Sequence, residues 1–157
     1  MEIQLICIGK TNKTFWSDAI KVYEKRINNY TKFSITYISD IRISKKTSPK
    51  KIKEEEANAF LKKISLKDDV ILLDENGKNL NSINFANKLK KKFIEGKKKI
   101  FFLIGGAYGF SDKIYSMFPE HLSLSKMTFS HQMVRLFFCE QLYRALTIIN
   151  NHPYHNK

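Results

Sequence analysis

Two short runs of this sequence are apolar at every position, and they restrict the fold more than any other feature. Val70–Leu73 and Ile100–Ile104 have the length of strands. Strands that are apolar on both faces are typical of parallel sheets covered by helices on both sides. Periodicity predicts further strands at Ile3–Ile8, Phe33–Ile38 and Leu122–Ser125. It also predicts helices over Thr14–Tyr30, Lys51–Ile64, from Ser82 to Gly96, from Ser111 to Phe118, and over His131–Ile149.

The alternation of strand and helix repeats five times, with no internal repeat and no long linker. A polar turn is expected at Asp74–Gly77 and a polar, basic loop at Asp40–Lys51. Ser82 and Ser111 are placed to cap helices. The pattern predicts one α/β domain over residues 1–157, with a mainly parallel sheet and flanking helices.

Three of the predicted strand ends carry residues suited to a ligand site. They are Leu73-Asp74, the loop Gly105–Gly109 and the polar bend after Leu122–Ser125. Ligands of open α/β sheets bind beyond the carboxyl ends of the strands, so these segments are expected to form a cleft for a small flat ligand. The glycine spacing fits neither the dinucleotide nor the P-loop fingerprint, and a plain tight turn remains the alternative.

The segment His131–Ile149 is the longest apolar run of the chain, and its apolar residues occupy more than one helical face. A helix of this kind must be covered on more than one side. The second cover is either a partner subunit, which we favour, or the core of a compact monomer. Beyond the helix, His152, Tyr154 and His155 are expected to form the rim of a pocket.

Three polar side chains of this helix have two interpretations each. Glu140 and Arg144 are four residues apart and can form an ordinary ion pair, or Arg144 can reach a phosphate or a base. For His131, at the start of the helix, capping or packing is favoured over catalysis.

The formal charge of +13 favours an anionic partner such as nucleic acid, although a general bias toward lysine and asparagine also explains it. We expect no signal peptide, because Glu2 and Lys10 flank only a short apolar run, and no membrane span, because no segment reaches the roughly 18 to 20 apolar residues that a span needs. Cys7 and Cys139 lie in apolar patterns without metal-ligand spacing and are expected to be buried free thiols of a reducing cytosol. No metal is predicted.

Four segments together resemble the RlmH family, and the resemblance covers essentially the whole chain. They are LLDENGK (72–78), FFLIGGAYGF (101–110), LSLSKMTFSHQMVRLFFCEQLYRA (122–145) and NHPYH (151–155). Members of this family are small SPOUT-class methyltransferases that act on a pseudouridine of 23S ribosomal RNA. The resemblance implies a cytoplasmic homodimer with a C-terminal trefoil knot that holds S-adenosylmethionine and methylates N3 of pseudouridine in the assembled ribosome. It places the cofactor contacts on Leu73, Gly105, Leu124, Ser125, Lys126, Met127, Thr128 and Phe129.

The same resemblance directs attention to the end of the chain for catalysis. The N3–H of the acceptor is a weak acid, so a base or a cationic neighbour must help to remove its proton. Tyr154 and His155 are the candidates, with Arg144 stabilising the developing negative charge and Glu140 as a further possibility.

Two other functions compete with methyl transfer. A non-enzymatic, basic RNA- or ribosome-binding protein would explain the charge, but it leaves the three strand-end loops without a purpose. A nucleotide-binding enzyme of the doubly wound type needs a glycine fingerprint after the first strand, which Gly9-Lys10-Thr11 does not supply.

Overall fold

The computed structural model describes residues 1–41 and 47–155, and its five strands form one parallel sheet in the order β2-β1-β4-β3-β5. The strands are β1 (Glu2–Ile8), β2 (Lys32–Ile38), β3 (Asp69–Asn79), β4 (Lys99–Ile104) and β5 (His121–Ser123). The helices are α1 (Thr14–Asn28), α2 (Pro49–Leu61), α3 (Ser82–Ile94), α4 (Asp112–Met117) and α5 (Met133–Ile149). The predicted parallel sheet with flanking helices is confirmed, whereas Arg42, Lys45 and Lys46 of the predicted basic loop lie outside the described residues.

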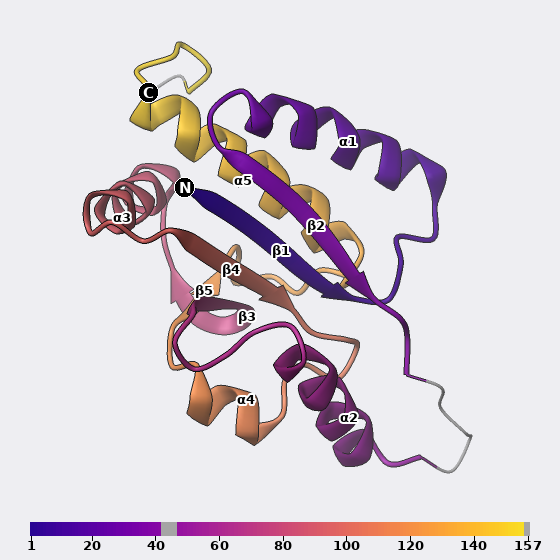
Figure 1. Ribbon diagram of the computed structural model, residues 1–157. Helices are drawn as coiled ribbons and strands as arrows, with labels where there is room; N and C mark the ends of the chain where they lie inside the picture. Colours follow the sequence, from indigo (N-terminus) through magenta and orange to yellow (C-terminus); the bar gives the residue numbers. More distant parts are fainter. Residues whose placement is uncertain (42–46, 156–157) are drawn as a thin grey trace.

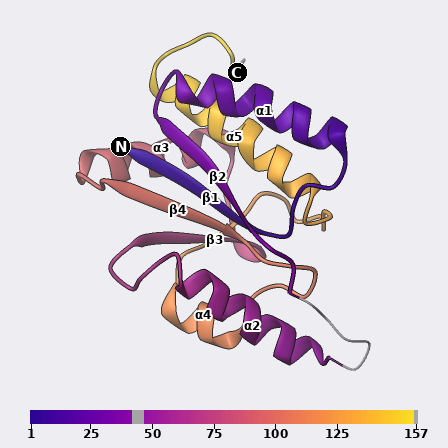
Figure 2. The ribbon, with the colours of Figure 1, turned by 45° about the vertical axis from the view of Figure 1, so that its right-hand side comes forward.

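The helices cover the sheet in two layers. Helices α1, α3 and α5 lie on one face, and α2 and α4 lie on the other (Figures 1 and 2). Side chains of β1 alternate between the two cores: Leu5 and Cys7 face the α5 layer, and Ile6 faces the α2 layer. Cys7 and Cys139 are both buried free thiols, as predicted.

The expected turn at Asp74–Gly77 is wrong, because β3 runs on to Asn79 with a break in its register. Leu73 and Lys78 both pair with Leu122 of β5, so the intervening residues form an excursion rather than a reversal of the chain. A β-carbon at Gly77 would lie 2.7 Å from backbone atoms of Leu122, so only glycine allows the two strands to approach here. The excursion holds polar residues at the carboxyl end of the sheet.

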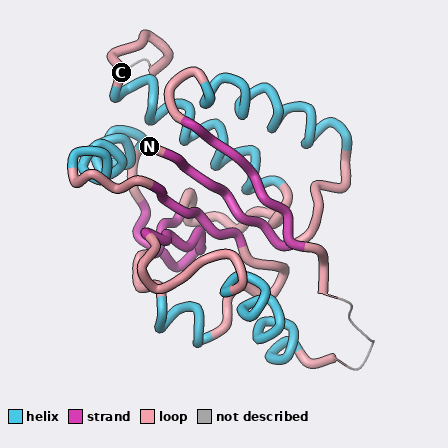
Figure 3. The backbone as a smooth tube through the Cα atoms, in the orientation of Figure 1, coloured by secondary structure: helices cyan, strands magenta, loops and turns pink. Residues whose placement is uncertain are grey.

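One of the two predicted helix caps needs correction. Asn81, not Ser82, caps α3 by accepting a hydrogen bond from the backbone N–H of Asn84 at 2.8 Å. Ser82 instead donates to Gln141 of α5 at 2.9 Å. Ser111 does cap α4, as predicted. The tube in Figure 3 shows the loops that connect these elements and gather at the strand ends.

Candidate functional site

A cavity of about 470 Å³ opens at the carboxyl ends of β3, β4 and β5. Its walls come from the excursion of β3, from the glycine loop after β4, and from the bend between β5 and α5. This is the position that the strand pattern predicted. The lining residues are 73–76, 104–110, Tyr115, 122–125, 127–131 and Val134.

The structure brings most of the predicted cofactor residues together at this cavity. Only Lys126 among them does not line it, and its side chain is exposed. Residues of three distant segments therefore meet because parallel strands end at the same edge of the sheet. The predicted residues that line the cavity are Leu73, Gly105, Leu124, Ser125, Met127, Thr128 and Phe129.

Hydrogen bonds hold the polar walls of the cavity in place. Asp74 accepts from the backbone N–H of Asn76 at 2.8 Å and from the hydroxyl of Tyr115 at 2.5 Å. Burial of Tyr115, together with the adjacent Asp74 carboxylate, raises the pKa of the Tyr115 phenol, which therefore stays a donor. Thr128 donates to Glu75 at 2.9 Å and links the bend after β5 to the excursion of β3.

Arg135 holds segments next to the cavity in place, a role that the sequence pattern did not predict. Its side chain is fully buried and donates to the carbonyl of Ile8 at 2.6 Å and to the hydroxyl of Thr11 at 3.1 Å. These bonds fix the connection after β1 against the start of α5. Partial burial, followed by the Arg135 charge, lowers the pKa of His131, which lines the cavity. The only signal in the sequence was an arginine inside an apolar helix.

His131 precedes α5 but does not cap it. The hydroxyl of Ser130, not the ring of His131, accepts a hydrogen bond from the backbone N–H of Met133 at 3.2 Å. His131 is half-buried beside Arg135 and faces the cavity. Of the two roles favoured for His131, capping and packing, its position fits packing.

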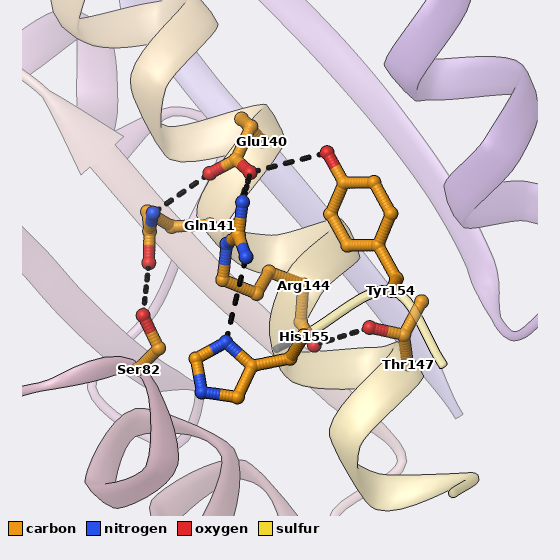
Figure 4. A network of polar contacts seen from close by, with 7 residues as sticks. All are labelled: Ser82, Glu140, Gln141, Arg144, Thr147, Tyr154 and His155. Atoms are coloured by element: carbon orange, nitrogen blue, oxygen red, sulfur yellow. Dashed lines mark hydrogen bonds and ion pairs between the residues drawn. The ribbon is translucent and has the colours of Figure 1, made fainter. Parts of the chain in front are cut away.

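The three predicted catalytic residues form a second cluster at the other end of α5 (Figure 4). Arg144 binds Glu140 through Nε at 3.0 Å and through a second guanidinium nitrogen. The hydroxyl of Tyr154 donates to Glu140 at 3.3 Å, and His155 Nδ1 lies 3.4 Å from Arg144 Nη1. The ordinary Glu140–Arg144 ion pair is thus present, and the tail folds back onto it. We call Glu140, Arg144, Tyr154 and His155 the tail cluster.

The electrostatics of the tail cluster distinguish its members. The hydrogen bonds from Arg144 to Glu140 raise the pKa of the guanidinium, which remains a cation. Burial, helped by a hydrogen bond with Tyr23 and by the charge of Glu140, raises the pKa of Tyr154 to about 12. The Tyr154 phenol is therefore protonated near neutral pH.

The cavity and the tail cluster do not meet within one chain. Val134 lines the cavity, and Arg144 lies ten residues further along the same helix, about 15 Å at the rise of an α-helix. The tail lies at the end of the sheet where β1 begins, opposite the strand ends (Figure 1). No member of the tail cluster lines the cavity.

Part of α5 stays uncovered in the single chain. Phe137 is 39% exposed and packs against Phe129 at a ring-centre distance of 4.7 Å. Met133 and Leu136, beside it, are half-buried. This apolar face, which we define by Phe129, Met133, Leu136 and Phe137, adjoins the cavity because Phe129 also lines it.

Within residues 1–41 and 47–155, no group of three or more His, Cys, Asp or Glu side chains is arranged to hold a metal ion. None of the helices described is long and apolar enough to cross a membrane.

Comparison with known proteins gives matches over the whole chain. The family model described as a predicted SPOUT methyltransferase matches residues 1–155. Three similar relatives carry the name Ribosomal RNA large subunit methyltransferase H. They come from Christiangramia forsetii (46% identical), Flavobacterium johnsoniae (50%) and Parabacteroides distasonis (46%), each over 157 residues and 100% of both chains.

Two solved structures are similar in fold. A probable methylase family protein from Haemophilus influenzae aligns with a TM-score of 0.52 and 15% identity, over 99% of this chain and 70% of that one. The tRNA (m1G37) methyltransferase from Aquifex aeolicus aligns with a TM-score of 0.56 and 16% identity, over 100% of this chain and 76% of that one. At these identities the likeness concerns the fold alone.

Proposed function

The chain belongs to the SPOUT methyltransferase family, among the relatives named ribosomal RNA large subunit methyltransferase H, and on this premise we propose its reaction. It transfers a methyl group from S-adenosylmethionine to N3 of a pseudouridine in 23S ribosomal RNA, on the assembled ribosome in the cytoplasm. The observation that carries the proposal is the cavity at the strand ends, whose walls contain seven of the eight residues that the family resemblance assigns to the cofactor.

The residues of the cavity fit S-adenosylmethionine. A volume of about 470 Å³ is in the range of sites for drug-sized ligands. Leu73, Leu124 and Phe129 offer apolar surface for a flat adenine ring, and the carboxylates of Asp74 and Glu75 suit the positive charge of a sulfonium. When bound, the cofactor supplies a methyl group on an activated sulfur. The C-terminal trefoil knot is part of the proposal, supported by the packing of the bend after β5 against the ends of β3 and β4.

The tail cluster supplies the acid–base chemistry of the proposed reaction. Arg144, held by Glu140, stabilises negative charge that develops on the acceptor base when its N3 proton leaves. Tyr154 is a poor base because its pKa is about 12, so it serves better as a hydrogen-bond donor. His155, beside Arg144, is then the better candidate to receive the proton.

A homodimer is the simplest way to join the two parts of the site. Since the cavity and the tail cluster lie at opposite ends of α5, the cavity of one protomer needs the tail cluster of its partner. The apolar face of Phe129, Met133, Leu136 and Phe137 is the surface that we expect the partner to cover. Such a face shared by both subunits fits a two-fold interface.

We expect the protein to sediment as a dimer of twice 18.4 kDa at micromolar concentration. Phe137→Asp should shift it to the monomer, because a carboxylate cannot be buried in an apolar interface without a partner. The matched control is Ile94→Asp on α3, where the side chain is 77% exposed. Analytical ultracentrifugation of both variants tests this, and a stable wild-type monomer would contradict the dimer.

The reaction itself is tested with purified protein and ribosomes that lack the modification. We expect labelled methyl groups to pass from S-adenosylmethionine to 23S ribosomal RNA, and digestion of the RNA to yield N3-methylpseudouridine. Steeply salt-dependent RNA binding without methyl incorporation would instead favour the non-enzymatic alternative. Folded protein that binds no S-adenosylmethionine in calorimetry would reject the proposed function.

A further inference from the structure

Glu56 of α2 is a buried carboxylate that the proposed reaction does not use. Its side chain is 6% exposed, and Oε2 accepts a hydrogen bond from the backbone N–H of Gly106 at 3.2 Å. Gly106 lines the cavity, and α2 lies on the opposite face of the sheet from α5. The carboxylate therefore touches the glycine loop from behind, on the side away from α5.

The lack of a side chain at Gly106 leaves room for this contact. Its backbone φ is not positive, so the backbone conformation alone does not require glycine. A β-carbon at this position, however, would overlap the Glu56 carboxylate. Glycine at 106 is thus explained by the close approach of Glu56, and Gly109, with φ of +72°, is explained by the turn itself.

The charge of Glu56 is costly where it lies. Burial, and to a lesser degree the nearby Asp40, raises the pKa of the carboxyl, whereas the hydrogen bond from Gly106 opposes that rise. Within the described residues, no lysine or arginine forms an ion pair with it. Because this buried carboxylate accepts its hydrogen bond from a backbone amide of the glycine loop, its stability depends on the position of that loop.

We propose that Glu56 is a positioning residue of the cofactor site, whose carboxylate holds the loop Gly105–Gly109 in the shape that binds S-adenosylmethionine. The inference rests on the proposed function. A loop held in its binding shape before the ligand arrives spares the ligand the cost of ordering it. The contact also links the glycine loop to α2, none of whose residues lines the cavity.

The test compares Glu56→Ala with Glu56→Gln by calorimetry with S-adenosylmethionine. We expect Glu56→Ala to weaken binding about tenfold and Glu56→Gln by no more than about threefold, because the amide oxygen still accepts from Gly106. Glu55→Ala, an exposed neighbour on the same helix, makes the same charge change and should leave binding unaltered. In the ribosome assay, Glu56→Ala should raise KM for the cofactor while kcat at saturation stays within about twofold.

A second variant covers the case in which Glu56→Ala does not fold. Gly106→Ala keeps Glu56 but forces its carboxylate and the loop apart, so it should also weaken binding. If both single variants fold, the double variant should bind no more weakly than Gly106→Ala, because the clash disappears with the carboxylate. Folded Glu56→Ala that binds like the wild type overturns the inference alone, whereas wild-type protein that binds no cofactor overturns the proposed function.

Discussion

Gly105→Val is expected to lower the affinity for S-adenosylmethionine by at least about 100-fold, a loss of about 2.7 kcal/mol of binding free energy. A β-carbon at Gly105 would lie 3.3 Å from the carbonyl carbon of Gly109, closer than side chains normally approach, and 3.5 Å from the ring of Phe110, which is an ordinary contact. The two further methyl groups of valine must then enter the cavity or displace the loop. Either change removes space that the cofactor needs.

Calorimetry on the folded variant measures this effect, with far-UV circular dichroism to verify the fold. Gly105→Ala is the matched control and should lose affinity by only a few-fold, because its single carbon sits at the limit of tolerated contact. Gly105→Val that folds and binds within about threefold of the wild type would show that the cofactor does not use this cavity. Methyl transfer to ribosomes should fall in parallel with binding.

The sheet and the position of the cavity were predictable because they depend on local patterns. Val70–Leu73 and Ile100–Ile104 are apolar throughout, and such runs belong to the buried centre of a parallel sheet, where the structure places β3 and β4. Once the strands are parallel, their carboxyl ends share an edge, so the loops after β3, β4 and β5 must converge. The individual cofactor residues came from the family resemblance.

The supports of the site were not predictable, because each depends on a contact between distant segments. Arg135 bonds to Ile8, which is 127 residues earlier, and Glu56 reaches Gly106, 50 residues later. In the sequence, Glu56 is one of three consecutive glutamates on a helix, and only packing shows that it is the buried one. The sequence predicts a turn at Asp74–Gly77 for the same reason. Its polar residues are typical of a chain reversal, and only the pairing of both Leu73 and Lys78 with Leu122 excludes one.

The tail cluster carries the other large expected effect. Arg144→Ala should lower kcat for ribosome methylation about 100-fold, the scale of a lost charge-stabilising group, with cofactor binding unchanged. Removing His152–Lys157 should also lower methylation while sparing folding and cofactor binding, because the helix and the cavity lie outside the deleted segment. Full activity of the truncated protein on ribosomes would exclude the tail from catalysis.

Mixing two inactive variants distinguishes a site within one chain from a site shared between protomers. Gly105→Val keeps an intact tail cluster, and Arg144→Ala keeps an intact cavity. If the partner's tail cluster completes the cavity, an equal mixture that exchanges subunits forms heterodimers in half of the dimers, each with one complete site. Activity should then recover to roughly a quarter of the wild-type value, from two proteins that are each nearly inactive. A mixture that exchanges subunits, as sedimentation of a tagged pair can verify, yet stays inactive would show that each cavity works with the Arg144 of its own chain. The separation of about 15 Å along α5 is why we expect recovery.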